Sequence, residues 1–179
     1  MGSLKMKEMM RYGFILAIIC TVASGLLAGV NALTKSRIAA QAQAEEDASL
    51  EEVLPEAVRF EAEKSGDEII YYKAQDKEGK LIGVAFKALG KGYSSDIETM
   101  VGMLKDGTIT AIKILNQNET PGLGARVTEN SFTGQFNNKN MQNLSQVQAI
   151  TGATISSKAV IDSVKKKAEE IKAVINNEK

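Results

Sequence analysis

The most constraining feature of this sequence is an uncharged apolar stretch close to its start. Residues 12–33 read YGFILAIICTVASGLLAGVNAL and contain no Asp, Glu, Lys or Arg. As an α-helix they would extend about 33 Å, enough to cross the hydrocarbon core of a bilayer, which is about 30 Å thick. The stretch therefore predicts one membrane-spanning helix. The alternative is a cleaved signal peptide, because Ala39, Ala40 and Ala42 lie downstream, although the stretch is long for that purpose.

The charges beside this stretch predict its orientation. Basic residues precede it (Lys5, Lys7, Arg11) and follow it (Lys35, Arg37). Positive charge is retained on the cytoplasmic side, so the excess on the N-terminal side makes residues 1–11 a cytoplasmic basic N-terminus. We therefore expect a single-pass protein of the cell (inner) membrane with its main domain extracytoplasmic. Residues 34–56 predict a stalk or linker helix, and residues 57–179 a folded domain.

Composition excludes several classes of function. The 179 residues include 44% hydrophobic and 25% charged residues, as folded proteins do. The absence of histidine excludes a Ser–His–Asp triad, a Cys–His dyad and His-ligated metal, and the single Cys20 excludes a disulfide framework. Equal numbers of basic and acidic residues argue against nucleic-acid binding. We therefore predict no catalytic side chains and no metal site, so any chemistry must come from a cofactor.

The first half of the domain has the pattern of antiparallel strands. Residues 68–74 (EIIYYKA) and 81–87 (LIGVAFK) flank a turn that ends at Gly79. Residues 97–104 and 108–115 (TITAIKIL) are joined through Asp106 and Gly107, which favour a primed hairpin turn with positive φ. We expect four strands that pair as two hairpins.

The second half is expected to be mostly helical. Residues 130–142 predict a short helix that presents Phe132 and Phe136 at i and i+4, and residues 147–150 predict a short strand. Residues 156–176 have apolar side chains at helical spacing, which predicts an amphipathic C-terminal helix. The fold class expected is α+β: one transmembrane helix, then an antiparallel sheet with flanking helices.

Three loops could carry a binding site. Residues 151–157 (TGATISS) precede the last helix, whose N-terminus favours a phosphate. Alternatively they form a capping turn with Ser156 or Ser157 as the N-cap. Residues 119–124 (ETPGLG) and 90–93 (GKGY) contain glycines that let the backbone approach a ligand closely, but each also fits an ordinary surface loop.

Taken together and in order, these loops resemble a known family. The segments GKGYSSDIETMVGM, NETPGLG and TGATISS, behind a single anchor helix, resemble an FMN-binding domain. That domain is shared by the G subunit of the Rnf electron-transport complex and the C subunit of the sodium-pumping NADH:quinone reductase. The resemblance covers nearly the whole chain, and its compact length is more similar to the Rnf protein.

The resemblance implies a covalent cofactor. In that family FMN is joined through its phosphate to the last threonine of the [ST]-G-A-T motif, which is Thr154 here. The remaining negative charge would then lie at a helix N-terminus, where it is favourable. The residues that the resemblance assigns to FMN binding are Tyr93, Glu119, Thr120, Gly122, Leu123, Gly124, Thr151, Gly152, Ala153, Thr154 and Ser156.

Two positions depart from the family pattern. Gln148 stands where the attachment motif usually has an acidic residue, which could slow modification by the flavin transferase. Gln117 stands near the position of a histidine that relatives often carry before the ETPGLG segment, which weakens any role for a histidine beside the flavin. Neither change removes the hydroxyl of Thr154.

The resemblance implies an electron-transfer subunit of an ion-translocating Rnf-type ferredoxin:NAD oxidoreductase. Its expected partners are the other membrane subunits of the complex and, during maturation, a flavin transferase. Two alternatives remain open. One is the flavoprotein subunit of a sodium-pumping NADH:quinone reductase. The other is a membrane-anchored interaction module without flavin, in which residues 151–157 only cap a helix.

Overall fold

A computed structural model describes residues 2–66 and 68–177 of the chain. The chain divides into two compact units, Met1–Ala44 and Glu45–Lys179. Helix α1 spans Gly2–Val53, so it forms the described part of the first unit and also begins the second. The expected helical continuation after residue 33 is therefore confirmed. Helix α1 ends just before Pro55, as expected because proline disfavours a helical conformation in the residue before it.

The apolar stretch of the first unit is exposed along its length. Within the described residues, α1 is the one helix that is long and apolar enough to cross a membrane. Leu16, Ile19, Leu26 and Leu27 are all exposed. An apolar surface of this extent is unfavourable in water, so the helix requires a lipid or protein environment.

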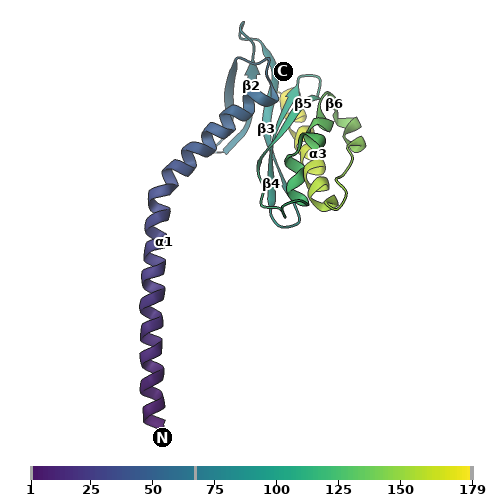
Figure 1. The fold of residues 1–179 in the computed structure, drawn as a ribbon. Helices are drawn as coiled ribbons and strands as arrows, with labels where there is room; N and C mark the ends of the chain where they lie inside the picture. The colour runs from purple at the N-terminus through teal and green to yellow at the C-terminus, as the bar shows by residue number, and fades with distance from the viewer. Residues whose placement is uncertain (1, 67, 178–179) are drawn as a thin grey trace. The chain divides into compact units, whose positions relative to one another are not determined.

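The second unit is built on one antiparallel sheet (Figure 1). Its strands lie side by side in the order in which they occur along the chain. They are β1 (Arg59–Ser65), β2 (Glu68–Gln75), β3 (Leu81–Lys91), β4 (Asp96–Leu104), β5 (Thr108–Asn116) and β6 (Lys139–Asn140). The four strands expected from the sequence are confirmed as β2 to β5. The two outer strands were not expected, since β1 is mostly charged and exposed and β6 has only two residues.

Both faces of the sheet are covered, because side chains on a strand alternate between its faces. On one face Phe86 and Val101 pack with residues of the C-terminal helix α3 (Thr154–Asn177). On the other face Ala85 and Met100 pack with the last turn of α1. Met100 and Val101 are adjacent in β4 and belong to different clusters, so this strand is buried on both sides.

Helix α3 lies very close to the sheet. A Cβ atom on Gly90 of β3 would collide with the backbone carbonyl oxygen of Ala159. Helix α3 also packs on β4 and on the 3₁₀ helix η1 (Gly124–Thr128). The sheet and the loop after β5 therefore determine together where the N-terminus of α3 lies.

The turn between β4 and β5 differs from the primed turn expected. Gly107 has φ +90°, but Asp106 does not have positive φ, and Gly107 N–H donates to the Leu104 carbonyl. This is a tight turn followed by a left-handed glycine, the usual three-residue hairpin. The Asp106 carboxylate accepts a hydrogen bond from Thr108 N–H at 2.8 Å, and this bond stabilises the turn.

Two expectations for the second half are wrong. The single helix expected over residues 130–142 is broken into α2 (Asn130–Thr133), η2 (Gly134–Phe136), β6 and the start of η3 (Met141–Gln146). Asn138 has φ +58°, which no continuous helix accommodates. Phe132 and Phe136 still meet in the core, with ring centroids 5.5 Å apart.

The strand expected over residues 147–150 is also absent. This segment belongs to no strand of the described sheet. Gln148 instead pairs through its backbone with the side chain of Gln135: its N–H donates to Oε1 at 2.9 Å and its carbonyl accepts from Nε2 at 3.3 Å. A side-chain amide thus substitutes for a neighbouring strand, and residue periodicity does not reveal this.

Candidate functional site

The three loops singled out in the sequence meet at one cleft. It has a volume of about 420 Å³ and lies between the β3–β4 loop, the loop after β5 and the start of α3. Its lining residues are Tyr93, Glu119, Thr120, Leu123, Gly124, Gly152, Ala153, Thr154, Ile155 and Ser156. Segments about 60 residues apart in the chain thus form one surface.

Two of the residues assigned from the sequence do not line this cleft. Gly122 lies in the turn from Thr120 to Leu123, with φ +75°, and Leu123 N–H donates to the Thr120 carbonyl at 3.1 Å. Thr151 is exposed beside the cleft. The glycine therefore shapes the loop that borders the cleft.

Glu119 joins all three segments through its carboxylate. Oε1 accepts from the N–H groups of Ser94 and Ser95 at 2.9 and 3.0 Å. Oε2 accepts from Tyr93 N–H at 3.3 Å and from the Ser156 hydroxyl at 2.6 Å. Glu119 is 6% exposed, so these bonds replace its contacts with water. Its carboxylate is already engaged, and its role is to position the cleft.

The Glu119 carboxylate is stabilised in its ionised form. Burial alone would raise its pKa, because a charge is costly away from water. The Ser156 hydroxyl and the backbone N–H groups of Ser95, Ser94 and Tyr93 outweigh burial, so the pKa of Glu119 lies below its ordinary value. The cleft therefore contains a fixed negative charge at neutral pH.

Two glycines let the segments approach Glu119. A Cβ on Gly92 would lie 2.5 Å from Oε1 of Glu119. A Cβ on Gly124 would lie 2.6 Å from both Glu119 Oε2 and Ser156 Oγ. Any other residue at either position would displace the carboxylate or the helix. These glycines are required by close packing, not by an unusual backbone angle.

Thr154 is the first residue of α3, and its side chain is exposed at the cleft. Ser157 N–H donates to the Ala153 carbonyl at 2.9 Å, which is the first bond of the helix. The N–H groups of Thr154, Ile155 and Ser156 therefore have no acceptor within the helix. They lie beside the Thr154 hydroxyl, and together with the helix dipole they favour an anion there.

Ser157 holds the turn before α3, a role that the sequence did not reveal. Its hydroxyl donates to the Ala153 carbonyl at 2.9 Å and accepts from Ile150 N–H at 3.0 Å. The turn itself has Gly152 at φ +83°. The alternative that Ser156 or Ser157 is the N-cap is wrong, because both lie inside the first turn of the helix.

The two positions that depart from the family pattern have different roles here. Gln117 Oε1 accepts from Glu119 N–H at 2.7 Å, so it supports the loop that carries the carboxylate. Gln148 is held through its backbone, and its side chain is exposed. An acidic residue at position 148 would therefore be accessible to another protein.

Three exposed apolar side chains surround the cleft. Tyr93 is 74% exposed, Leu123 50% and Ile155 55%. Ile155 was not assigned to the site from the sequence. Its position could have indicated it, because it is an apolar residue next to Thr154 that does not belong to the buried face of α3. Apolar side chains on three segments form a suitable border for a flat apolar ligand.

Comparison with known proteins identifies the family. Residues 92–169 match the FMN-binding domain model, and residues 1–53 match the RnfG N-terminal region. The chain is 31% identical to the G subunit of the ion-translocating oxidoreductase complex of Methanosarcina acetivorans, over 93% of this chain and 96% of that protein. The chain belongs to the RnfG family.

Other relatives have related names. The G subunit of the proton-translocating ferredoxin:NAD(+) oxidoreductase complex of Clostridium ljungdahlii is 36% identical, over 87% of this chain and 88% of that protein. The crystal structure of NqrC from Shewanella oneidensis aligns with a TM-score of 0.47 at 21% identity, over 68% of this chain and 74% of that one. With one described helix that is both long and apolar enough to cross a membrane, this member of the RnfG family is a single-pass membrane protein.

The cleft of this RnfG family member fits FMN. All of its lining residues fall within the matched FMN-binding domain. It has an accessible hydroxyl and helix N-terminal N–H groups for a phosphate, and an apolar border for a ring system. A Cβ on Gly152 would lie 3.5 Å from Leu123 Cδ2, so the backbone at Gly152 lies close to this border.

Proposed function

We propose that this chain is the electron-transfer subunit of an Rnf-type ferredoxin:NAD oxidoreductase complex and carries FMN covalently at Thr154. Its family and the matched FMN-binding domain support the cofactor. The names of the Clostridium ljungdahlii and Acetobacterium woodii relatives, both from ferredoxin:NAD(+) oxidoreductase complexes, support the complex. Its partners are then the other membrane subunits of that complex.

The observation that carries the attachment site is the position of Thr154. Its side chain is exposed at the first position of α3, beside three N–H groups without an acceptor in the helix. In the linkage, a bond forms between Thr154 Oγ and phosphorus. The hydroxyl loses its proton, and the leaving group of an activated flavin phosphate departs. A flavin transferase catalyses this step in the proposal.

The residues of the chain bind and orient, while FMN supplies the redox chemistry when it is bound. The N-terminus of α3 stabilises the charge of the phosphodiester. Tyr93, Leu123 and Ile155, which are exposed at the cleft, would contact the ring and exclude water from part of it. Glu119 holds the three segments at a fixed spacing, and its negative charge favours the oxidised, less negative state of a nearby redox group.

We further infer that residues 1–11 are cytoplasmic and that the second unit is extracytoplasmic. The excess of basic residues before the apolar stretch supports this orientation. A covalent link is advantageous on that side of the membrane, because a dissociated flavin would be lost from the cell.

The test is the intact mass of the denatured full chain, produced with its flavin transferase. We expect a gain of one FMN minus one water, mapped to the peptide with Thr154, and flavin fluorescence in a denaturing gel. Thr154→Ala should abolish both, whereas Thr154→Ser should retain them. Thr151→Ala is the matched control, because it removes an exposed hydroxyl of the same motif.

Two results would contradict the attachment claim. One is the full mass gain in Thr154→Ala. The other is an unmodified wild-type chain beside a transferase that is active on a control protein. A chain that assembles with its partners and supports their turnover without flavin would favour an interaction module instead.

A further inference from the structure

A second, larger groove lies between β2 and β3. β3 pairs with β4 along its whole second half, from Phe86↔Val101 to Lys91↔Asp96. On its other side the described pairing with β2 ends at Tyr72↔Ala85. β2 continues back to Glu68, and in the part of the chain that the structure describes its residues before Tyr72 pair with β1. β2 and β3 therefore diverge beyond Tyr72 and Ala85, and β3 and β4 extend past the β1–β2 hairpin (Figure 1).

The groove runs along strand edges. It has a volume of about 680 Å³ and is lined by the four consecutive residues Ile69, Ile70, Tyr71 and Tyr72, and opposite them by Phe86, Lys87 and Leu89. Neighbouring residues of a strand point to opposite faces, so a groove lined by consecutive residues faces the edge of the backbone. Within the described residues, no strand occupies the β2 side of β3 from Phe86 to Lys91.

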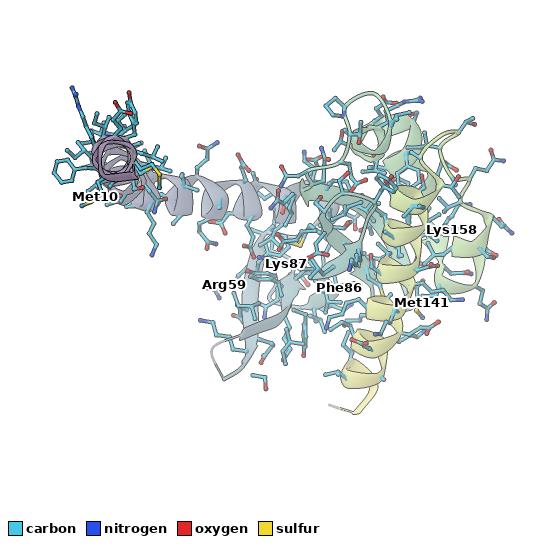
Figure 2. All side chains as sticks on the ribbon, turned by 90° about the horizontal axis from the view of Figure 1, so that it is seen from below. Met10, Arg59, Phe86, Lys87, Met141 and Lys158 are labelled. Atoms are coloured by element: carbon cyan, nitrogen blue, oxygen red, sulfur yellow. The ribbon has the colours of Figure 1, made fainter. Side chains whose placement is uncertain are left out.

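Helix α3 forms the third wall of the groove and gives it a positive charge. Lys166, Lys167 and Glu170 line this wall, and Lys167 Nζ lies 3.3 Å from Glu170 Oε2. Lys87, at the opposite wall, is paired with Glu46 and Glu98 (2.6 and 3.6 Å). Lys166 is exposed, and its charge is not balanced by these pairs. Figure 2 shows Lys87 and Phe86 beside each other on the sheet.

We propose that an extended segment of another protein of the same complex adds a strand to the open edge of β3 in this groove. The inference rests on the proposed function only in requiring partner subunits. A strand is the occupant that fits, because it supplies the missing main-chain donors and acceptors. A helix already pairs its own main-chain donors and acceptors internally, so it would leave the edge of β3 unpaired. The open edge from Phe86 to Lys91 would pair over about 20 Å.

The side chains define the chemistry of that segment. Leu89 is 68% exposed and Ile69 is 37% exposed at the groove, so apolar residues of the segment would cover them. An acidic residue of the segment would pair with Lys166. An exposed apolar strand edge is otherwise a site of aggregation, which a partner strand prevents.

Hydrogen exchange distinguishes this pairing from mere proximity. Amides of β3 that face β2 should exchange fast in the full chain alone. In the assembled complex their exchange should be slower by about tenfold or more. β4 residues 98–103 are already paired on both sides and serve as an internal reference. Equal exchange of residues 86–91 in both samples, with the chain shown to copurify with its partners, would overturn the proposal.

A pair of matched variants provides the second test. Leu89→Asp places a charge in the groove, and Val58→Asp changes a residue of similar exposure (61%) outside it. We expect Leu89→Asp to reduce recovery of the assembled complex about tenfold or more and Val58→Asp to leave it unchanged. Covalent flavin should persist in both, which separates this test from that of the proposed function. Equal recovery of both variants would contradict the proposal.

A photo-crosslinking phenylalanine analogue at position 89 identifies the occupant. We expect a crosslink in the assembled complex to one non-helical segment of a partner protein that contains an acidic residue. A crosslink to a helical segment, or to a second copy of this chain, would overturn the assignment.

Discussion

The Ser156 hydroxyl lies 2.6 Å from Glu119 Oε2 and donates a hydrogen bond to it. This contact links the first turn of α3 to the loop after β5, across 37 residues of chain. Both side chains are buried, so the position of Thr154, two residues before Ser156, depends on it. The stability of the cleft and its dependence on pH follow from this bond.

Ser156→Ala should destabilise the domain by about 1–3 kcal/mol, because it removes a donor from a buried carboxylate. Urea denaturation of the full chain in detergent measures this loss. Ser145→Ala is the control, because Ser145 is exposed and its hydroxyl makes only a long bond of 3.4 Å to the Gln142 carbonyl. An equal loss in both variants would show that the Glu119 contact contributes nothing specific.

The stability of the second unit should fall in acid, partly through Glu119. Its pKa is lower in the folded than in the unfolded chain, so its contribution to stability is fully present above the pKa of the unfolded chain. That contribution is lost as pH falls through the folded pKa. Asp106 acts in the same direction, because Thr108 lowers its pKa through hydrogen bonds.

Urea midpoints between pH 3 and pH 7 test this dependence. Glu119→Gln should be less stable at neutral pH and should show a shallower loss of stability towards acid, with the part due to Asp106 retained. A pH dependence identical to that of wild type would exclude Glu119 as a source.

Gly124→Ala should destabilise the domain by about 1–3 kcal/mol and reduce flavin attachment. The added Cβ would lie 2.6 Å from Glu119 Oε2 and Ser156 Oγ, so the loop or the helix must move. Gly134→Ala is the control, because its Cβ would approach only the Asn130 side chain, at 3.2 Å. Thermal unfolding and the flavin content of both variants measure the difference, and equal effects would contradict the close-packing argument.

Glu46→Ala should loosen the end of α1 from the sheet. Glu46 accepts from Tyr72 OH at 2.5 Å and from Lys87 Nζ at 2.6 Å. Burial and this bond raise the pKa of Tyr72, so the tyrosine should titrate at lower pH in the variant. Phenolate absorbance during alkaline titration shows the change. Glu51→Ala, at an exposed position of the same helix, should leave the titration unaltered.

Gln148→Asp should accelerate flavin attachment severalfold without affecting the fold. The position is held by backbone bonds to Gln135, and its side chain is exposed, so a carboxylate there is available to the transferase. A time course of covalent flavin fluorescence compares it with Gln142→Asp, which adds a charge at another exposed position. Equal rates would mean that the flavin transferase does not recognise an acidic residue at position 148 of this chain.

The sequence alone determined the parts that depend on local pattern. The apolar stretch of residues 12–33 predicted a helix, and runs of strand-forming residues bounded by turns predicted β2 to β5, because β-branched and aromatic side chains pack well on a pleated sheet. The order of three glycine-containing loops indicated most residues of the cleft. The prediction failed at two places: β1 is mostly charged, and Gln148 pairs with a side chain instead of a strand.

Only the tertiary structure decided what the residues of the cleft do. The sequence assigned both Glu119 and Leu123 to FMN binding, and both line the cleft. The fold encloses the Glu119 carboxylate between three segments and leaves Leu123 exposed. The fold also leaves the β2 side of β3 without a described strand partner from Phe86 to Lys91, since strand partners are chosen by packing between distant segments. Local sequence determines which helices and strands form. The role of each residue depends on the tertiary structure, because groups distant in the chain compete for the same hydrogen bonds and the same buried space.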